Sequence, residues 1–179
     1  MKQADALKEL AYWDKQGRYV FRKSDLSIVF DEYGRTLDQT LVRLTKNGML
    51  ERVARGVYVF AMSRHIGFAT VEHIARNLRR GELTYETLES ALSAYGVISQ
   101  IPIDRLTLMT TGRSGEYKTP YGVIEFTHTK APINTIVENV IERENHAIPI
   151  ANKYYAYTNL QSVGRSLDLI DQEELNDPA

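Results

Sequence analysis

The sequence predicts a two-domain α+β protein, and three observations lead to that class. Apolar residues recur at helical spacing in several segments, short β-prone runs separate them, and charge is distributed unevenly. Residues 1–65 carry a net charge of +4 and the remainder carries −5, so the formal net charge of −1 is a cancellation. The length of 179 residues suits two small domains, which we place at 1–64 and 65–179.

The first domain begins with three predicted helical or β-prone segments. Apolar residues at helical spacing predict a helix over 3–16, ended by Gly17. A β-prone run at 19–21 follows, and Ser24 is the expected N-cap of a short helix over 26–30. This order places a strand between the first two helices.

A third helix over 36–46 and a hairpin complete the predicted first domain. Leu37, Leu41 and Leu44 form one apolar stripe, and Asn47-Gly48 ends the helix. Strands over 49–54 and 57–60 flank Arg55-Gly56, which predicts a tight basic turn. Such an order is typical of a winged helix-turn-helix domain, with the third helix for recognition and the hairpin as the wing.

The polar face of the third helix suits double-stranded DNA. Arg43 can pair with guanine, Gln39 can read adenine, and Thr36, Thr40 and Lys46 can contact phosphates or a thymine methyl. The alternative is a solvated face that serves protein contacts. The full predicted DNA-binding set is Arg22, Lys23, Ser24, Arg35, Thr36, Gln39, Thr40, Arg43, Lys46, Arg52 and Arg55.

The second domain is expected to be mixed α/β with a small antiparallel sheet. Helices are predicted over 69–80 and 84–95, and strands over 106–110, 116–119 and 123–128. A mixed stretch with Pro132 and Pro149 precedes a helix over 154–170, and the acidic tail 171–179 is expected to fray.

Several function classes are excluded by composition and motifs. The chain has no cysteine, and its four histidines show no metal-ligand spacing, so we expect neither metal nor cofactor. No P-loop or hydrolase signature is present, and we expect no enzyme. No stretch approaches 18 uncharged apolar residues, which predicts a cytoplasmic protein without membrane contact.

Glycines and cations gather in the segment 110–120. Arg113 and Lys118, beside Gly112 and Gly115, are suited to form an anion-binding nest that holds the phosphate of a substrate. A hairpin turn explains the same residues. Both interpretations stay open at this point.

Three motifs together resemble the AbiEi family of antitoxins from bacterial toxin–antitoxin and abortive-infection modules. They are GMLERVARGVY at 48–58, LESAL at 88–92 followed by Tyr95-Gly96, and a Thr110-Thr111 strand leading through Arg113 and Tyr117 to TPYG at 119–122. The similarity covers about residues 4–130.

The resemblance implies an antitoxin that represses its own operon by binding inverted repeats in its promoter. It further implies that the second domain counters a nucleotidyltransferase-type toxin, by direct binding or by acting on the toxin's target, with Arg113, Tyr117 and Lys118 as candidate residues. Two copies on an inverted repeat would need half-sites about 34 Å apart, or a multiple of that spacing. A winged-helix protein-interaction module and a generic transcriptional regulator without a toxin partner are the alternatives.

Overall fold

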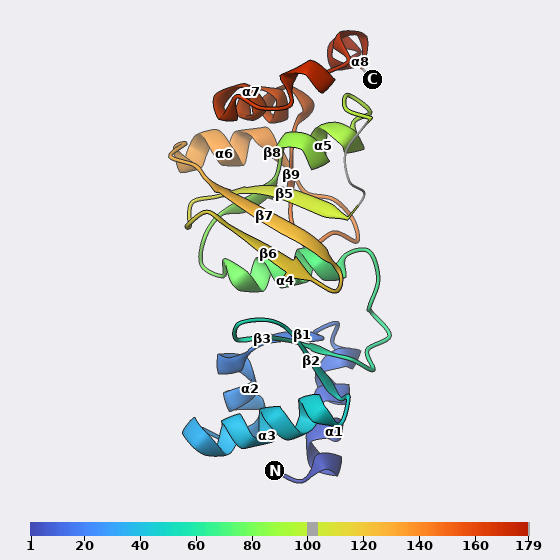
Figure 1. Cartoon of the computed structure of the whole chain (residues 1–179), viewed down its shortest axis with the longest axis vertical. Helices are drawn as coiled ribbons and strands as arrows, with labels where there is room; N and C mark the ends of the chain where they lie inside the picture. The colour runs from blue at the N-terminus through green and yellow to red at the C-terminus, as the bar shows by residue number, and fades with distance from the viewer. Residues whose placement is uncertain (100–103, 179) are drawn as a thin grey trace. The chain divides into compact units, whose positions relative to one another are not determined.

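The protein divides into two compact units, Met1–Leu78 and Arg79–Ala179 (Figure 1). The computed structural model describes residues 1–99 and 104–178. The described residues combine α-helices with one antiparallel and one mixed sheet, which confirms the predicted α+β class. Each unit has its own sheet and its own buried apolar residues.

The first unit builds a three-stranded antiparallel sheet from β1, β3 and β2, in that order. Val20 pairs with Val59 and Leu50 pairs with Phe60, so the hairpin and the early strand share one sheet. Its elements are α1 (Gln3–Lys15), β1 (Val20–Arg22), α2 (Lys23–Phe30), α3 (Gly34–Lys46), β2 (Leu50–Ala54), β3 (Val57–Phe60) and α4 (Thr70–Leu78).

The start of α2 differs from the sequence prediction. Arg22 is the N-cap, and Ser24 lies inside the first turn, so the expectation that Ser24 caps this helix is wrong. The Arg22 backbone N–H donates to the Asp25 carboxylate at 2.8 Å. β1 runs directly into α2, which moves the cap two residues earlier than a serine-based rule places it.

The division between the units falls after Leu78, whereas the sequence placed it after residue 64. The reason is α4, which packs on β1 and β3 of the first unit. The Thr70 and Tyr19 hydroxyls lie 3.0 Å apart, and His73 packs edge-on against the Tyr19 ring at 5.3 Å. Tyr19 and Thr70 are both buried, and this long-range contact has no signal in the local sequence pattern.

The second unit carries a six-stranded mixed sheet in the order β6-β7-β5-β4-β9-β8, so the predicted small antiparallel sheet is wrong in size and in strand direction. The β5–β7 and β4–β9 pairs are parallel. Its strands and helices are β4 (Thr84–Glu86), α5 (Leu88–Ala94), β5 (Arg105–Thr110), β6 (Gly115–Thr119), β7 (Gly122–His128), α6 (Ile133–Asn139), β8 (Val140–Ile141), β9 (Ile150–Ala151), α7 (Lys153–Val163) and α8 (Gln172–Asn176).

Two predicted helices of this unit are shorter than expected. The segment 84–95 splits into β4 and α5, because Thr84 pairs with Thr110 and Glu86 pairs with Leu108. Leu88 starts α5 at a φ of 60°, so the chain turns sharply between strand and helix. The helix predicted over 154–170 stops earlier, as α7 at Val163, and its C-cap Gly164 adopts a left-handed conformation.

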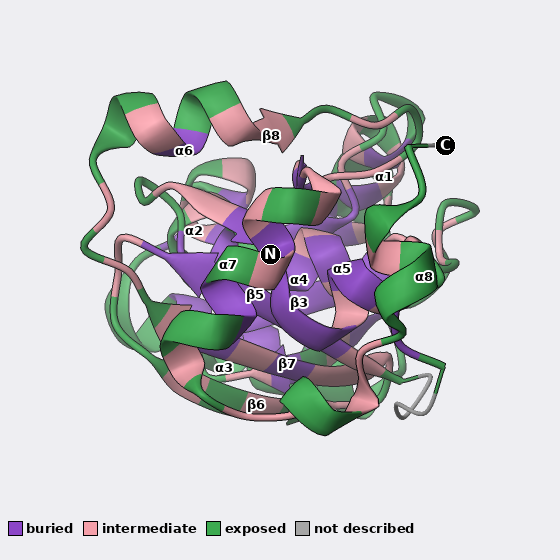
Figure 2. Ribbon diagram, turned by 90° about the horizontal axis from the view of Figure 1, so that it is seen from above, coloured by how far each residue is buried: buried purple, intermediate pink, exposed green. Residues whose placement is uncertain are grey.

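The core of the second unit lies between the sheet and the helices α5 and α7. Tyr85, Leu92, Met109 and Leu160 are buried in one cluster. Asn159 of α7 donates to the Thr87 hydroxyl at 3.0 Å, which fixes the helix against the turn before α5. Figure 2 shows β5 buried, whereas α8 and most of α6 are exposed. These contacts join the sheet to α5 and α7 in one packed cluster.

Candidate nucleic-acid interface

Helix α3 is amphipathic, and its apolar stripe anchors it in the first unit. Leu37, Leu41 and Leu44 are at most 2% exposed, as their spacing predicts. The helix ends at Lys46 with Asn47 as its C-cap, and Gly48 follows with a φ of 71°. The predicted helix, its stripe and its stop are therefore confirmed, with a start two residues earlier at Gly34.

The opposite side of α3 forms an exposed row that we call the outer stripe. It consists of Arg35, Gln39, Val42 and Lys46, which follow one another at spacings of four, three and four residues and therefore share one helix face. All four are exposed, and the Val42 side chain is 69% exposed. Sequence reasoning named the three polar members and missed Val42, although helical spacing alone places it in the row.

Two predicted contact residues on α3 have other surroundings. Thr40 is only 3% exposed and forms a hydrogen bond with the Glu32 carboxylate, so the prediction that it contacts DNA is wrong. Arg43 is exposed, but its guanidinium donates to the Met1 carbonyl oxygen. Thr36 remains exposed at the start of the helix.

Glu32 lies beside this part of α3 as a buried carboxylate. Burial favours its neutral form, but hydrogen bonds from the Met1 amino group and Thr40, together with the nearby charge of Arg43, outweigh this, so its pKa is lowered. The Arg43 guanidinium is therefore held by the N-terminal residue and by this negative charge.

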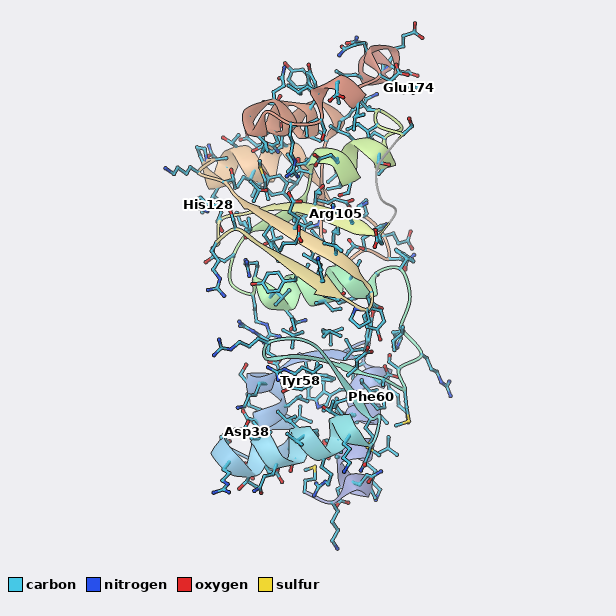
Figure 3. The ribbon with its side chains drawn as sticks, viewed as in Figure 1. Asp38, Tyr58, Phe60, Arg105, His128 and Glu174 are labelled. Atoms are coloured by element: carbon cyan, nitrogen blue, oxygen red, sulfur yellow. The ribbon has the colours of Figure 1, made fainter. Side chains whose placement is uncertain are left out.

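The start of α2 and the hairpin turn bring four of the predicted residues together. The Lys23 backbone N–H donates to the Gly56 carbonyl at 2.9 Å, and Arg22 lies opposite Val57 in the sheet. Arg55 is exposed at the turn, where Gly56 needs a φ of 74°. Lys23 also pairs with Asp38 of α3, which Figure 3 labels. Ser24 is exposed next to this cluster.

A phosphate at the N-terminus of α2 would meet a carboxylate already present there. Asp25 accepts from the Arg22 backbone and pairs with Arg18 at 3.0 Å. The amide groups of this helix start are therefore a weaker anion site than the sequence suggests. Arg52, exposed on β2 at an irregularity in the pairing with β3, completes the predicted set.

In the second unit the structure brings Arg113 and Tyr117 together through Arg79. The Arg79 Nε donates to the Arg113 carbonyl at 2.9 Å, and its Nη1 donates to the Tyr117 hydroxyl at 3.2 Å. The guanidinium carbon lies 4.1 Å from the centre of the Phe126 ring, a cation–π contact. Sequence reasoning missed Arg79, because it lies 34 positions from Arg113 and no local motif marks it.

Lys118 lies on the other face of β6. Neighbouring residues of a strand point to opposite faces, so Tyr117 faces Phe126 while Lys118 is exposed beside Glu116. The candidate residues of this unit are thus divided between two faces. Burial raises the pKa of Tyr117, but Arg79 and Arg113 outweigh it, and the net pKa lies below the usual 10.0.

A chain of ion pairs joins the segment after α7 to the sheet. Arg165 donates to both carboxylate oxygens of Glu89, at 2.7 and 3.0 Å, and also contacts Glu125. Arg105 continues the chain by pairing with Glu125 at 3.0 Å and with Glu116 at 2.9 Å. This network holds the segment after α7 on the sheet of the second unit.

Within residues 1–99 and 104–178, no group of three or more His, Asp or Glu side chains is arranged to hold a metal ion. No helix in the same residues is long and apolar enough to cross a membrane.

Taken together, the fold and the interface define a two-unit α+β protein that presents one exposed helix face with polar ends and an apolar member in its middle. A model for a family of unknown function, DUF6088, matches residues 15–148, and the chain belongs to this family. No curated protein matches the sequence.

One solved structure shares the fold. The chain is similar to the RV2827C protein from Mycobacterium tuberculosis, with a TM-score of 0.55 and 14% sequence identity. The match covers 87% of this chain and 59% of the mycobacterial chain, so this chain spans less than two thirds of its neighbour's length. At this identity the likeness concerns the fold alone.

Proposed function

We propose that the first unit is a winged helix-turn-helix domain that binds double-stranded DNA through the outer stripe of α3. The observation that carries the proposal is the stripe itself, in which Arg35, Gln39 and Lys46 are exposed while the opposite face is buried. The hairpin between β2 and β3, with exposed Arg55 at its turn, is the wing of this domain. Arg22, beside the turn, supplies further charge for phosphates.

The dimensions of α3 support docking in the major groove. Arg35 and Lys46 are separated by a rise of roughly 16 Å along the helix, at about 1.5 Å per residue. The major groove of B-DNA is about 12 Å wide, so the two cations reach the phosphates on its two sides. Gln39 then lies between them, within reach of base edges.

We further propose that the protein is an antitoxin that represses its own operon, as its resemblance to AbiEi antitoxins suggests. In this proposal the second unit counters a nucleotidyltransferase-type toxin, and the Arg79–Arg113–Tyr117 cluster is its candidate contact. The supporting features are the three shared motifs and the defined geometry of that cluster.

DNA footprinting of the region upstream of the gene tests autorepression. Protection of an inverted repeat is expected, and protection of no such repeat would refute autorepression. Arg55→Ala should weaken binding to specific and random duplexes equally and lower the slope of log Kd against log salt by about 1. Lys8→Ala is the matched control, because Lys8 is an exposed cation on α1 outside the interface.

Co-expression with the product of the adjacent gene tests the antitoxin role. Growth rescue by the wild type and loss of rescue in Arg113→Ala, with Lys130→Ala as the control, would support the cluster's role. Rescue without a complex in pull-down would point to action on the toxin's target. No rescue from any neighbouring toxin would refute the antitoxin proposal while leaving DNA binding intact.

A protein-interaction module is the second candidate, and exposed apolar side chains on the first unit favour it. Ile28 on α2 is 75% exposed and Tyr33 at the start of α3 is 66% exposed. Two results together would select this function. Ile28→Asp would abolish capture of the partner protein, and the wild type would bind no DNA.

A further inference from the structure

Val42 is the unexpected member of the outer stripe. It exposes 69% of its surface in the middle of α3, with polar residues on both sides along the stripe. A β-branched residue is a mediocre helix former, and at an exposed position burial gives it no compensating stability. Its side chain therefore adds little to the stability of the folded unit and is available for contact with a partner.

The residues beside Val42 on α3 are already engaged within the first unit. Arg43 donates to the Met1 carbonyl oxygen, and Asp38 pairs with Lys23. The stripe thus presents, in order along the helix, the cation Arg35, Gln39, Val42 and the cation Lys46. Asp38 lies beside the stripe and its charge is paired with Lys23 of α2, so the four residues of the stripe itself include no acid.

This order matches the chemistry of a major groove. Cations at the two ends meet phosphates, and the central pair meets base edges. Among the groups that base pairs present in the major groove, the C5-methyl of thymine is the apolar one. An amide such as Gln39 makes a bidentate contact with adenine, and residues three apart on a helix have Cβ atoms about 5–6 Å apart.

We propose that Val42 is a specificity-determining residue that packs against the C5-methyl group of a thymine, next to an adenine read by Gln39. This inference rests on the proposed DNA binding and deepens it, because it assigns an A·T-containing step to the centre of each half-site. Phosphate contacts from Arg35 and Lys46 fix the register in which Val42 meets that base.

Replacing thymine with uracil tests the contact, since uracil differs from thymine only by the missing methyl. Full-length wild type first selects duplexes from a random-sequence library, and the enriched duplex is then resynthesised with deoxyuridine at one thymine at a time. At one position per half-site, the wild type should lose affinity about three- to fivefold, the scale expected for one buried methyl. Val42→Ala should bind the thymine duplex about as weakly and lose its response to uracil at that position.

Val137→Ala is the matched control, because Val137 is an exposed valine on a helix of the other unit, 58% exposed. It should keep the full response to uracil. The urea midpoint of Val42→Ala, followed by Trp13 fluorescence, should equal that of the wild type, so any loss of affinity reports the contact.

The possible outcomes distinguish the role of Val42 from the proposed DNA binding on which it rests. An enriched duplex that shows no sensitive thymine, or a sensitive thymine whose effect survives in Val42→Ala, overturns the role of Val42 while specific DNA binding stands. Selection that enriches no sequence, together with no footprint, overturns the DNA-binding proposal and this inference with it.

Discussion

Replacing Thr70 with valine tests whether α4 belongs to the first unit. The Thr70 hydroxyl accepts from the Gly67 backbone N–H at 2.9 Å and lies 3.0 Å from the Tyr19 hydroxyl. Thr70 is 0% exposed and Tyr19 is 2% exposed, so water cannot replace the lost partner of the tyrosine. Thr70→Val keeps the shape of the side chain and removes its hydrogen bonds.

The expected cost follows from which groups lose a partner. An unsatisfied buried hydroxyl costs about 1–3 kcal/mol, so Thr70→Val should lower the free energy of unfolding by about 2 kcal/mol. Tyr19→Phe removes the other partner and leaves Thr70 bonded to Gly67, which should cost about 1 kcal/mol. The double variant should cost less than the sum, because both changes remove the same contact.

Urea unfolding followed by tryptophan fluorescence measures these costs in the correct unit. The chain has one tryptophan, Trp13, and it lies on α1 of the first unit. With a urea slope of about 1–2 kcal/mol/M, the midpoint should fall by about 1–2 M in Thr70→Val. Thr45→Val is the control, since Thr45 is exposed on α3 and its replacement should change stability by less than about 0.5 kcal/mol.

A Trp13 transition that is unchanged in Thr70→Val would refute the reasoning. It would mean that α4 contributes nothing to the first unit and that the division lies near residue 64, as the sequence alone suggested. Additive costs in the double variant would separately contradict a direct contact between Tyr19 and Thr70.

Three further predictions concern titrating groups. Burial raises the pKa of Glu89, but hydrogen bonds from Arg165 outweigh it, so the folded pKa lies below 4.5. The stabilisation by this carboxylate is therefore lost as the pH falls below 4.5. Glu89→Gln should flatten the plot of the urea midpoint against pH in that range. Burial lowers the pKa of His73 below 6.5, so His73→Gln should reduce the loss of stability as the pH falls below 6.5, and an unchanged slope would contradict this. Arg79→Met should raise the pKa of Tyr117, because it removes a guanidinium that lowers this pKa. The Tyr117 signal is the difference in ultraviolet titration between Arg79→Met with and without Tyr117→Phe. A pKa below that of the wild type would exclude the charge effect of Arg79.

The parts of the fold that local spacing determines were predictable from the sequence. Helix α3 follows from Leu37, Leu41 and Leu44, and the hairpin follows from Arg55-Gly56 between two β-prone runs. These elements have their pattern within one segment, so neighbouring residues are enough to predict them.

The short strands of the second unit are not determined by their local sequence. β4, β8 and β9 have only two or three residues each and exist because they pair with one another and with β5. Thr84–Glu86 lies next to a helical pattern, and only the partner strand selects the extended conformation there. The same limit applies to the candidate sites, since the contacts of Arg79 with Arg113 and of Tyr19 with Thr70 join residues far apart in the chain.

Moving the division between the units from residue 64 to residue 78 does not change the net charge of either unit. Residues 65–78 contain one acid, Glu72, and one cation, Arg76, so the first unit keeps its net charge of +4 and the second keeps −5. A net charge of this size can steer association with DNA but cannot place a contact. The outer stripe is more specific evidence for a nucleic-acid partner, because it carries two cations and no acid. The one acidic side chain in the body of α3, Asp38, is paired with Lys23. Local arrangement, more than the charge total, is therefore what favours a nucleic-acid partner for this unit.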